Sequence, residues 1–322
     1  MYKDKLKKIL VVVITAFGVL LITTGGYAWH TFTSTFTNIQ EEIDDQKNQI
    51  RLENIDLEAG EPISLLLIGV DEPGEKGDPN QRSDTLIYVT LNPKTETTHM
   101  VSIPRDTYTE MIGNIRSDKV SDSTALDNAK DKITHSYALG GTNMTVQSVE
   151  NFLDARVDYF VKVDLTGLED MIDAVDGIEV NNSFEFAYHG ITFEEGPIQL
   201  NGEEAREYVR MRKDDPRGDF GRQERQRQVI QAILEKGTTL TGLTSSISNF
   251  KEILTAIEDN FRTNLGLESM WDIQGNYRDA LNNIVEHEIP GEDGEIDETY
   301  YYMPDEEKVQ ELSEELNEQL GE

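Results

Sequence analysis

Arginine residues are concentrated in one segment of this chain, between Arg206 and Arg227, where seven of 22 residues are arginine. The chain as a whole has 62 aspartates and glutamates against 29 lysines and arginines, so this segment is unusually basic for its protein. Several guanidinium groups that converge on one site suit phosphate oxygens, because each group donates two parallel hydrogen bonds. A salt-bridged helix is the alternative, since eight acidic residues lie between positions 201 and 236.

Charged residues also stand at the ends of three consecutive predicted strands. The first strand is a continuous apolar run, which is typical of a strand covered on both faces. The residues at the strand ends are Asp71 after strand 63–70, Arg82 and Asp84 before strand 85–92, and Arg105 and Asp106 after strand 99–103. Each of the three strands therefore presents an aspartate or an arginine at an end.

The arginine-rich segment begins with a pattern that allows a strand. If residues 208–212 are extended, the period of two places Tyr208, Arg210 and Arg212 on one face and the two residues between them on the other. Two guanidinium groups would then point in the same direction from one strand.

A turn and a helix are predicted to follow. The turn covers residues 214–221 and the helix runs to about Lys236. Arg222 and Gln226 lie four residues apart, so they share one face of the helix, and the apolar residues within 229–234 form its buried stripe. This helix would add a further arginine and an amide to the candidate phosphate site.

The remaining patterns alternate between helix and strand. Helices are predicted over 125–141, 142–154, 165–175 and 305–320, and strands over 159–163 and 300–302. Together with the three strands described above, this alternation predicts an α/β fold in which helices sandwich a central mixed sheet.

Composition excludes several classes of function. The formal net charge of −33 makes general nucleic-acid binding unfavourable, because phosphate backbones are bound by basic surfaces. The absence of cysteine excludes disulfide scaffolds, iron–sulfur clusters and thiol catalysis. The chain has five histidines, none of them at the spacing of a metal motif, so we do not expect a histidine-based zinc site.

The N-terminus predicts a membrane anchor. Residues 1–8 are lysine-rich and residues 9–29 are apolar and uncharged, which is long enough for a transmembrane helix with its N-terminus in the cytoplasm. A cleaved signal peptide is the alternative, because small residues occur near 26–28. Residues 30–61 are polar and are predicted to form a stalk, either a short coiled coil or a loose tether. The folded domain is then expected over 62–322, outside the cytoplasm.

Five short motifs together resemble the LytR–CpsA–Psr family. They are GVD at 69–71, RSDT at 82–85, SIPRDTY at 102–108, KITHSYALGG at 132–141 and YVRMRKDDPRGDFGRQERQRQVI at 208–230. Each motif is short, but their order, their spacing and the membrane-anchored setting make the joint resemblance specific. The close matches cover 62–235, and the acidic part 236–322 would complete the domain.

This resemblance implies a function. Members of the family are extracytoplasmic phosphotransferases of Gram-positive bacteria, which move anionic glycopolymers such as teichoic acid or capsule from a polyprenyl-pyrophosphate carrier to peptidoglycan. The acceptor is the 6-hydroxyl of N-acetylmuramic acid. The implied fold is an α/β sandwich with an apolar cavity for the polyprenyl tail.

The resemblance also implies roles for individual residues. Asp71 and Asp84 would bind Mg²⁺, which takes hard oxygen ligands and commonly combines one or two carboxylates with substrate phosphates. Asp106 would either orient Arg105 or act as a base towards the sugar hydroxyl, and the orienting role is favoured because a buried arginine needs a carboxylate partner. The pyrophosphate would be held by Arg82, Arg105, Arg210, Arg212 and Arg222, with Gln226 adding a hydrogen bond.

Two other functions stay open at this point. One is a hydrolase that cleaves the lipid pyrophosphate at the same site without a sugar acceptor. The other is a non-enzymatic regulator or binding module of the cell envelope.

The acidic region 284–322, which has 15 acidic residues and one lysine, is interpreted as a solvated face and not as a metal cluster.

Overall fold

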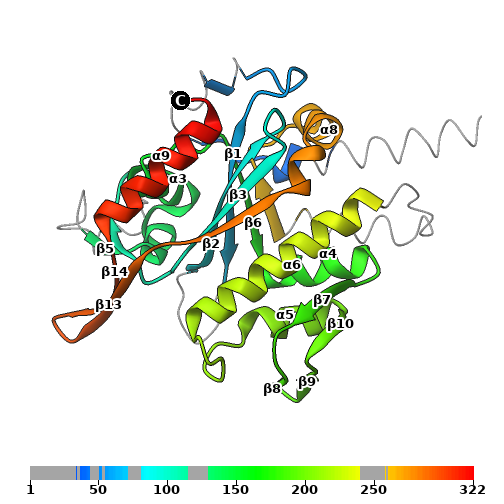
Figure 1. The fold of residues 1–322 in the computed structure, drawn as a ribbon, viewed down its shortest axis with the longest axis vertical. Coiled ribbons are helices and arrows are strands. Elements are labelled where there is room, and N and C mark those ends of the chain that lie inside the picture. Colours follow the sequence, from blue (N-terminus) through cyan, green and yellow to red (C-terminus); the bar gives the residue numbers. More distant parts are fainter. Residues whose placement is uncertain are drawn as a thin grey trace, which may run out of the picture.

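A six-stranded mixed sheet forms the centre of the fold (Figure 1). The computed structural model describes residues 34, 37–43, 51–52, 55–71, 81–114, 130–239, 258 and 260–322. In the order in which they lie in the sheet, the strands are β11 (Phe261–Thr263), β6 (Tyr159–Asp164), β1 (Ile63–Val70), β2 (Ser83–Asn92), β3 (Thr97–Ile103) and β12 (Ile284–Glu288). β1, β2 and β3 are antiparallel neighbours, whereas β6 pairs in parallel with β1 and β12 pairs in parallel with β3.

Helices cover both faces of this sheet (Figure 1). On one face lie α3 (Thr134–Leu153) and α9 (Glu306–Leu320), and on the other lie α4 (Leu165–Ala174), α6 (Asp219–Thr239) and α8 (Leu267–Asn276). Successive side chains of a strand point to opposite faces. Leu66 and Ile68 of β1 therefore enter the core beneath α3 and α9, while Leu65 and Leu67 face the other layer. The predicted α/β fold, with helices on both sides of a central mixed sheet, is confirmed.

A smaller layer supports α6 at the lower edge of the molecule in Figure 1. It consists of the pair β7 (Ile178–Asn182) and β10 (Gly196–Leu200), the hairpin β8 (Phe186–Tyr188) and β9 (Ile191–Phe193), and α5 (Gly202–Arg210). The rings of Phe186, Phe193 and Tyr208 pack together in its core. This layer holds α5 and α6 in place beneath the sheet.

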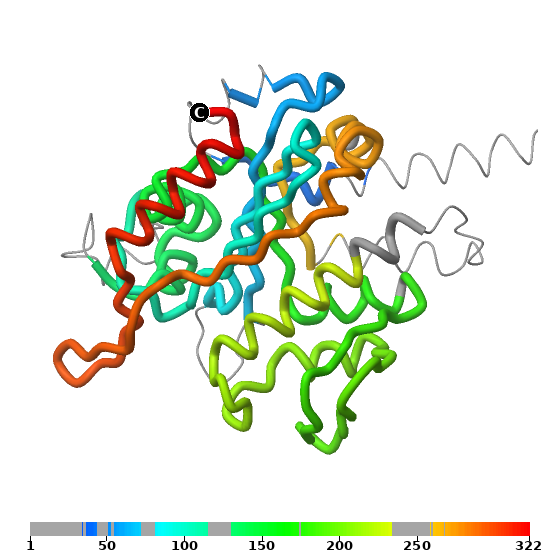
Figure 2. Tube along the Cα trace, viewed as in Figure 1, coloured from blue at the N-terminus to red at the C-terminus, as the bar shows by residue number. Residues whose placement is uncertain are grey.

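The C-terminal segment completes the layer of helices that contains α3. The hairpin β13 (Gly291–Ile296) and β14 (Thr299–Pro304) follows β12, and the chain then returns as α9 alongside α3 (Figure 2). The predicted strand at 300–302 and the predicted final helix are confirmed. Two shorter strands, β4 (Tyr108–Glu110) and β5 (Lys130–Lys132), pair with each other, and a 3₁₀ turn, η3 (Asp279–Asn282), precedes β12.

The strand predicted over 208–212 is wrong. Residues up to Arg210 belong to helix α5, and Met211 follows it in an extended conformation. The helix begins with a capping box, in which the Asn201 side chain accepts from the Glu204 amide and the Glu204 side chain accepts from the Asn201 amide. These reciprocal bonds favour the helix over a strand. Tyr208 therefore points into the core instead of sharing a face with Arg210.

The two helices predicted over 125–141 and 142–154 are also only partly correct. Residues 130–132 form a strand, and the helical part begins at Thr134. α3 then runs to Leu153 with one break at Gly141, whose φ is 69°. That conformation is accessible to glycine at little cost, so the chain changes direction inside one element instead of ending a helix.

Residues upstream of the predicted domain boundary pack against the fold. Ile39 is 1% exposed and Ile43 is 2% exposed, and Gln40 forms a β-bridge with Thr263. Parts of the predicted stalk 30–61 thus belong to the folded unit, because their apolar residues are buried against it. The predicted cytoplasmic segment 1–8 and transmembrane helix 9–29 lie outside the described residues. None of the helices in the described part of the chain combines the length and the apolar character that a membrane span requires.

Candidate active site

A cavity of about 1070 Å³ lies between the sheet and the helices α4, α6 and α8. Its walls are mainly apolar and come from strands and helices alike. They include Leu67 and Val89 from the sheet, Leu168 from α4, Ile230 from α6 and Ile273 from α8. An apolar cavity of this size inside a folded domain is suited to a long hydrocarbon ligand.

Charged residues line one end of the same cavity. Seven of the site residues predicted from the sequence line the cavity: Asp71, Asp84, Arg105, Arg210, Arg212, Arg222 and Gln226. Two predicted site residues do not line it. Arg82 is exposed at the start of β2, and Asp106 lies behind Arg105, where it is 8% exposed. The fold thus brings together residues from the first three strands and from both ends of the arginine-rich segment.

The ladder between β2 and β3 explains the pairing of Arg105 with Asp84. This antiparallel ladder ends with Leu86 opposite Ile103, so Asp84, just before that end, and Arg105, just after it, lie at the same end of the two strands. Arg105 Nη1 donates to Asp84 Oδ2 at 2.7 Å. Burial opposes the charge on Arg105, but the carboxylates of Asp84, Asp106 and Asp219 raise its pKa, so the guanidinium is held as a cation at the cavity.

Asp106 is surrounded by cations. Its Oδ1 accepts from Lys132 Nζ at 2.8 Å, and its Oδ2 lies 3.5 Å from Arg105 Nε and 4.0 Å from Arg212 Nη2. Burial alone would raise the pKa of Asp106, but the hydrogen bond from Lys132 and the charges of Arg105 and Lys132 lower it below its usual value. A carboxylate with a lowered pKa is a weak base, so this geometry supports the orienting role and not the role of a general base.

The pH dependence of activity tests this assignment. Because the pKa of Asp106 is lowered, its carboxylate stays ionised between about pH 5 and pH 8 and contributes no titration there. We expect Asp106→Asn to reduce kcat by about 10- to 100-fold, since Arg105 loses its orienting anion. The shape of the kcat/KM profile across that range should not change. Loss of one limb of the profile in the variant would instead identify Asp106 as the base.

Asp219 connects three arginines of the site. Its carboxylate lies 2.8 Å from Arg222 Nη2 and 3.3 Å from Arg212 Nε, and its charge contributes to the raised pKa of Arg105. Burial lowers the pKa of Arg222, which is 6% exposed, while Asp219 and Asp84 oppose that shift. Asp219 was not predicted from the sequence, although it lies within the arginine-rich motif.

Buried polar atoms at this end of the cavity lack hydrogen bonds. Among the described residues, Asp84 Oδ1 and Arg222 Nε have no hydrogen-bond partner. Buried polar groups in folded proteins are normally satisfied, so unsatisfied ones at a cavity indicate where a ligand or an ion supplies the partner. Both signs are present, which suits an anionic ligand together with a cation.

The carboxylates fit a magnesium ion. Asp84 Oδ1 is a hard oxygen donor to which none of the described residues donates a hydrogen bond, and Asp71 lines the same cavity at the end of β1. The backbone N–H of Asp71 donates to the carbonyl of Arg82 at 3.1 Å, which fixes this strand end beside the start of β2. Two carboxylates with room for water and phosphate oxygens form a donor set that Mg²⁺ accepts.

The arginine-rich segment divides into two groups, so both sequence interpretations apply to it. Arg210, Arg212 and Arg222 line the cavity. The others pair elsewhere: Arg206 with Glu169, Arg217 with Glu224, Arg225 with Asp215, and Arg227 with Glu286. Arg225 and Arg227 are each 3% exposed, so their role is to hold α6 against its neighbours. Charge counting cannot separate the two groups, because it does not show which side of the helix faces the cavity.

Lys132 and Glu207 are functional candidates that sequence reasoning missed. Lys132 opens the motif KITHSYALGG, and its contact with Asp106 gives that position a physical reason. Glu207 accepts from Arg210 Nη1 at 3.1 Å and from His189 Nδ1 at 2.7 Å, which fixes Arg210 at the cavity. The available signals were the position of Lys132 in a motif and that of Glu207 in the arginine-rich segment, one residue before the motif 208–230.

Comparisons with known proteins agree with this fold. A model of the LytR_cpsA_psr family matches residues 26–318. The polyisoprenyl-teichoic acid–peptidoglycan teichoic acid transferase TagU of Bacillus subtilis (strain 168) is 48% identical over 322 residues, which cover 99% of this chain and 98% of TagU. The crystal structure of B. subtilis TagU has a TM-score of 0.61 over 81% of this chain and 97% of its own. A structure of TagT bound to LIIa-WTA has a TM-score of 0.66 at 29% identity, over 84% and 94% of the two chains.

Proposed function

Because this chain belongs to the LytR–CpsA–Psr family, we propose that it transfers a teichoic-acid-like glycopolymer from a polyprenyl-pyrophosphate carrier to peptidoglycan. One structural observation supports the proposal in addition to the similarity with known proteins. A single cavity is apolar along most of its length and lined by aspartates and arginines at one end. Such a cavity matches a donor that has a hydrocarbon tail, a pyrophosphate and a polar glycan.

The proposed reaction is a phosphoryl transfer. The 6-hydroxyl oxygen of N-acetylmuramic acid attacks the phosphorus that carries the glycan, and a new phosphorus–oxygen bond forms. The bond between that phosphorus and the bridging oxygen breaks, and polyprenyl monophosphate leaves with the electron pair. The hydroxyl proton passes to solvent. The glycan thus reaches peptidoglycan together with one phosphate.

Arg105, Arg210, Arg212 and Arg222 are proposed to bind the pyrophosphate, with Gln226 as a further donor. Negative charge grows on the bridging oxygen as the bond breaks, so fixed cations in a partly buried site stabilise the transition state more than the ground state. Arg82 is proposed to reach the outer part of the glycan or its phosphate from the rim of the site. Asp106 and Asp219 keep these arginines in position.

Asp71 and Asp84 are proposed to hold Mg²⁺. When bound, the ion would neutralise the charge of the pyrophosphate oxygens. Removing divalent ions with a chelator is expected to abolish transfer, and added Mg²⁺ should restore it. Asp84→Asn should raise the Mg²⁺ concentration needed for half-maximal activity, because a neutral amide binds the ion more weakly.

The apolar part of the cavity is proposed to hold the polyprenyl tail. Ile230 contributes to its wall from α6 and is only partly buried, so a larger side chain there can extend into the cavity. Ile230→Trp should raise KM for a long-chain donor by about tenfold, the effect expected from losing a few buried methylene groups. The same variant should leave KM for a donor with a very short prenyl chain unchanged.

Ile230→Val is the matched control, because it removes volume without blocking the cavity. It should leave KM for both donors within about twofold. An equal rise in KM for long-chain and short-chain donors in Ile230→Trp would contradict the assignment of this cavity to the tail.

The proposed location is the outer face of the cytoplasmic membrane of a Gram-positive bacterium, with residues 9–29 as a single anchor. The lysines before the apolar run and the acidic character after it support this orientation. The proposed lipid-linked donor is consistent with this location, because such a donor is delivered at a membrane surface.

The hydrolase alternative uses the same site, so the test of function must separate the two reactions. The full-length chain in detergent is incubated with Mg²⁺ and a labelled polyprenyl-pyrophosphate glycan, with and without peptidoglycan. A transferase is expected to move the label to insoluble peptidoglycan and to release little label when peptidoglycan is absent. Rapid release of soluble glycan phosphate without an acceptor would instead support the hydrolase.

A further inference from the structure

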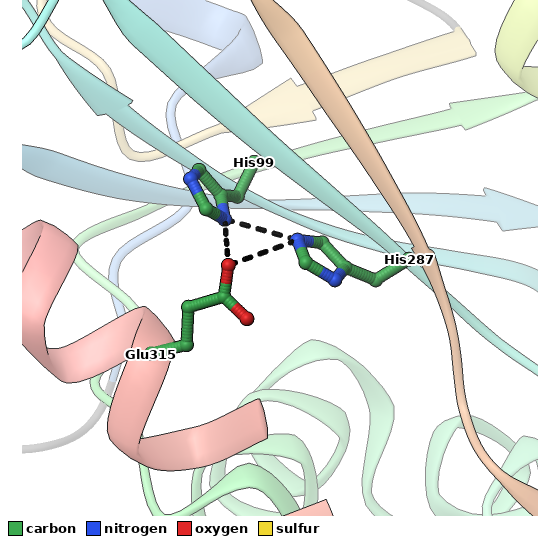
Figure 3. Close-up of side chains that lie close together, drawn as sticks. All are labelled: His99, His287 and Glu315. Carbon is green, nitrogen blue, oxygen red and sulfur yellow. Dashed lines mark hydrogen bonds and ion pairs between the residues drawn. The ribbon is translucent and has the colours of Figure 1, made fainter. Parts of the chain in front are cut away.

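Two histidines and a glutamate from distant parts of the chain converge on one point (Figure 3). His99 Nδ1 lies 2.9 Å from His287 Nε2, although the two residues are 188 positions apart. Glu315 Oε1 lies 3.5 Å from His99 Nδ1 and 3.9 Å from His287 Nε2. Three potential ligand atoms therefore face one another across a space of a few ångströms.

The fold explains why these residues meet. His99 lies on β3 and His287 on β12, which are parallel neighbours, and in their register His287 is opposite Val101, two positions beyond His99. Both side chains thus point to the same face of the sheet, where their rings stack with centroids 5.0 Å apart. Glu315 reaches them from α9, which crosses that face.

This cluster is separate from the candidate active site. Thr98 and Met100, the neighbours of His99 along β3, line the large cavity on the opposite face of the sheet. The His99 side chain is 5% exposed, that of His287 is 17% exposed and that of Glu315 is 50% exposed. The cluster is therefore buried at His99, partly buried at His287 and open to water at Glu315.

The spacing of the three atoms fits a tetrahedral metal ion. An ion with bonds of about 2.0–2.1 Å holds its ligand atoms about 3.3 Å apart, and the three distances of 2.9, 3.5 and 3.9 Å lie on either side of that value. Small side-chain shifts would equalise them. Two imidazoles and one carboxylate form a donor set that zinc accepts, with water in the fourth position.

A hydrogen bond between the two rings would account for only part of this arrangement. It uses one proton between two nitrogens. At 3.5 and 3.9 Å, Glu315 Oε1 lies within ion-pair distance of both rings, but it is too far for a good hydrogen bond to either.

We propose that His99, His287 and Glu315 form a binding site for a divalent transition-metal ion of the zinc class, which ties α9 to the edge strand β12. The site lies on the face of the sheet away from the cavity, so we expect the bound ion to stabilise the fold and to take no part in glycan transfer. Its nitrogen donors distinguish it from the proposed Mg²⁺ site, whose ligands are carboxylates. The absence of a histidine motif in the sequence did not exclude such a site, since its ligands come from three separate elements.

Zinc binding by the full-length chain in detergent tests the proposal. The chain is purified with a tag that lacks histidine, stripped with a chelator and titrated with ZnCl₂ by calorimetry. One zinc ion per chain is expected, and zinc at about 100 times its dissociation constant should raise Tm by about 5 °C. Cobalt(II) bound in place of zinc should show the intense visible absorption of a tetrahedral site.

Three variants assign the ligands. His287→Ala and Glu315→Gln should each lose the tetrahedral cobalt spectrum and most of the zinc-dependent rise in Tm. Glu315→Gln keeps the size of a half-exposed side chain, so it remains informative if His287→Ala does not fold. Glu314→Gln, the exposed neighbour on α9, is the matched control and should behave as the parent chain. No zinc binding by the parent chain, or unchanged binding in Glu315→Gln, would overturn the proposal.

Discussion

Arg105→Ala is expected to lower the rate of glycan transfer by about 100- to 1,000-fold, which corresponds to about 3–4 kcal/mol of transition-state stabilisation. Arg105 lines the charged end of the cavity and is fixed on both sides, by Asp84 at 2.7 Å and by Asp106 at 3.5 Å. A positioned cation of this kind acts on the charge that develops during the reaction. The loss should therefore appear in kcat measured at saturating donor, and less in KM.

Two further variants make this prediction specific. Arg105→Lys should recover only part of the activity, because an ammonium group cannot reproduce the planar fork of a guanidinium. Arg217→Ala is the matched control, since Arg217 is 52% exposed and pairs with Glu224 away from the cavity. It should retain nearly full activity. Equal losses in Arg105→Ala and Arg217→Ala would show that the net charge of the segment matters and not the position of Arg105.

Asp215→Ala is expected to destabilise the protein by about 3–5 kcal/mol, because it leaves a buried cation without its counter-ion. The side chains of Arg225 and Asp215 are 4% and 2% exposed and form an ion pair. Arg225 also donates from Nε to the carbonyl of Tyr208 at 3.0 Å and from Nη2 to the carbonyl of Met211. The pair thereby connects α6 to the end of α5, close to Arg210 and Arg212, which line the cavity.

Thermal unfolding of the purified variants measures this effect. Glu224→Ala is the matched control, because it removes an exposed ion pair on the same helix and should change stability by less than about 1 kcal/mol. If Asp215→Ala unfolded at nearly the same temperature as Glu224→Ala, Arg225 would not depend on Asp215, and the division of the arginines into two groups would fail.

Much of the sheet could be predicted from the sequence because its signals are local. The run 63–70 is apolar except for Ser64, as is typical of a strand covered on both faces, and it forms β1 with alternate residues in two cores. The sequence also places Asp84 and Arg105 at the ends of predicted strands. Their contact follows from the antiparallel order of β2 and β3, which a short turn between consecutive strands favours.

Other features depend on contacts that one local pattern does not contain. The segment 208–212 alternates apolar and charged residues as a strand does, but the capping box at Asn201, seven residues upstream, makes it the end of a helix. The division of the arginines depends on which face of α6 meets the cavity. His99 and His287 meet because β12 pairs in parallel with β3. The spacing of residues within a motif cannot predict this pairing, since the two strands are far apart in the sequence.

The most direct measurement of the central claim is where the glycan phosphate goes when the reaction runs in heavy-oxygen water. The full-length chain is incubated with Mg²⁺, donor and peptidoglycan, the product is digested with a muramidase, and the fragments are analysed by mass spectrometry. Our account predicts a phosphodiester on the 6-oxygen of N-acetylmuramic acid without heavy oxygen, formed by the parent chain and lost in Arg105→Ala. Free glycan phosphate that contains heavy oxygen, with no modified muramic acid, would contradict it.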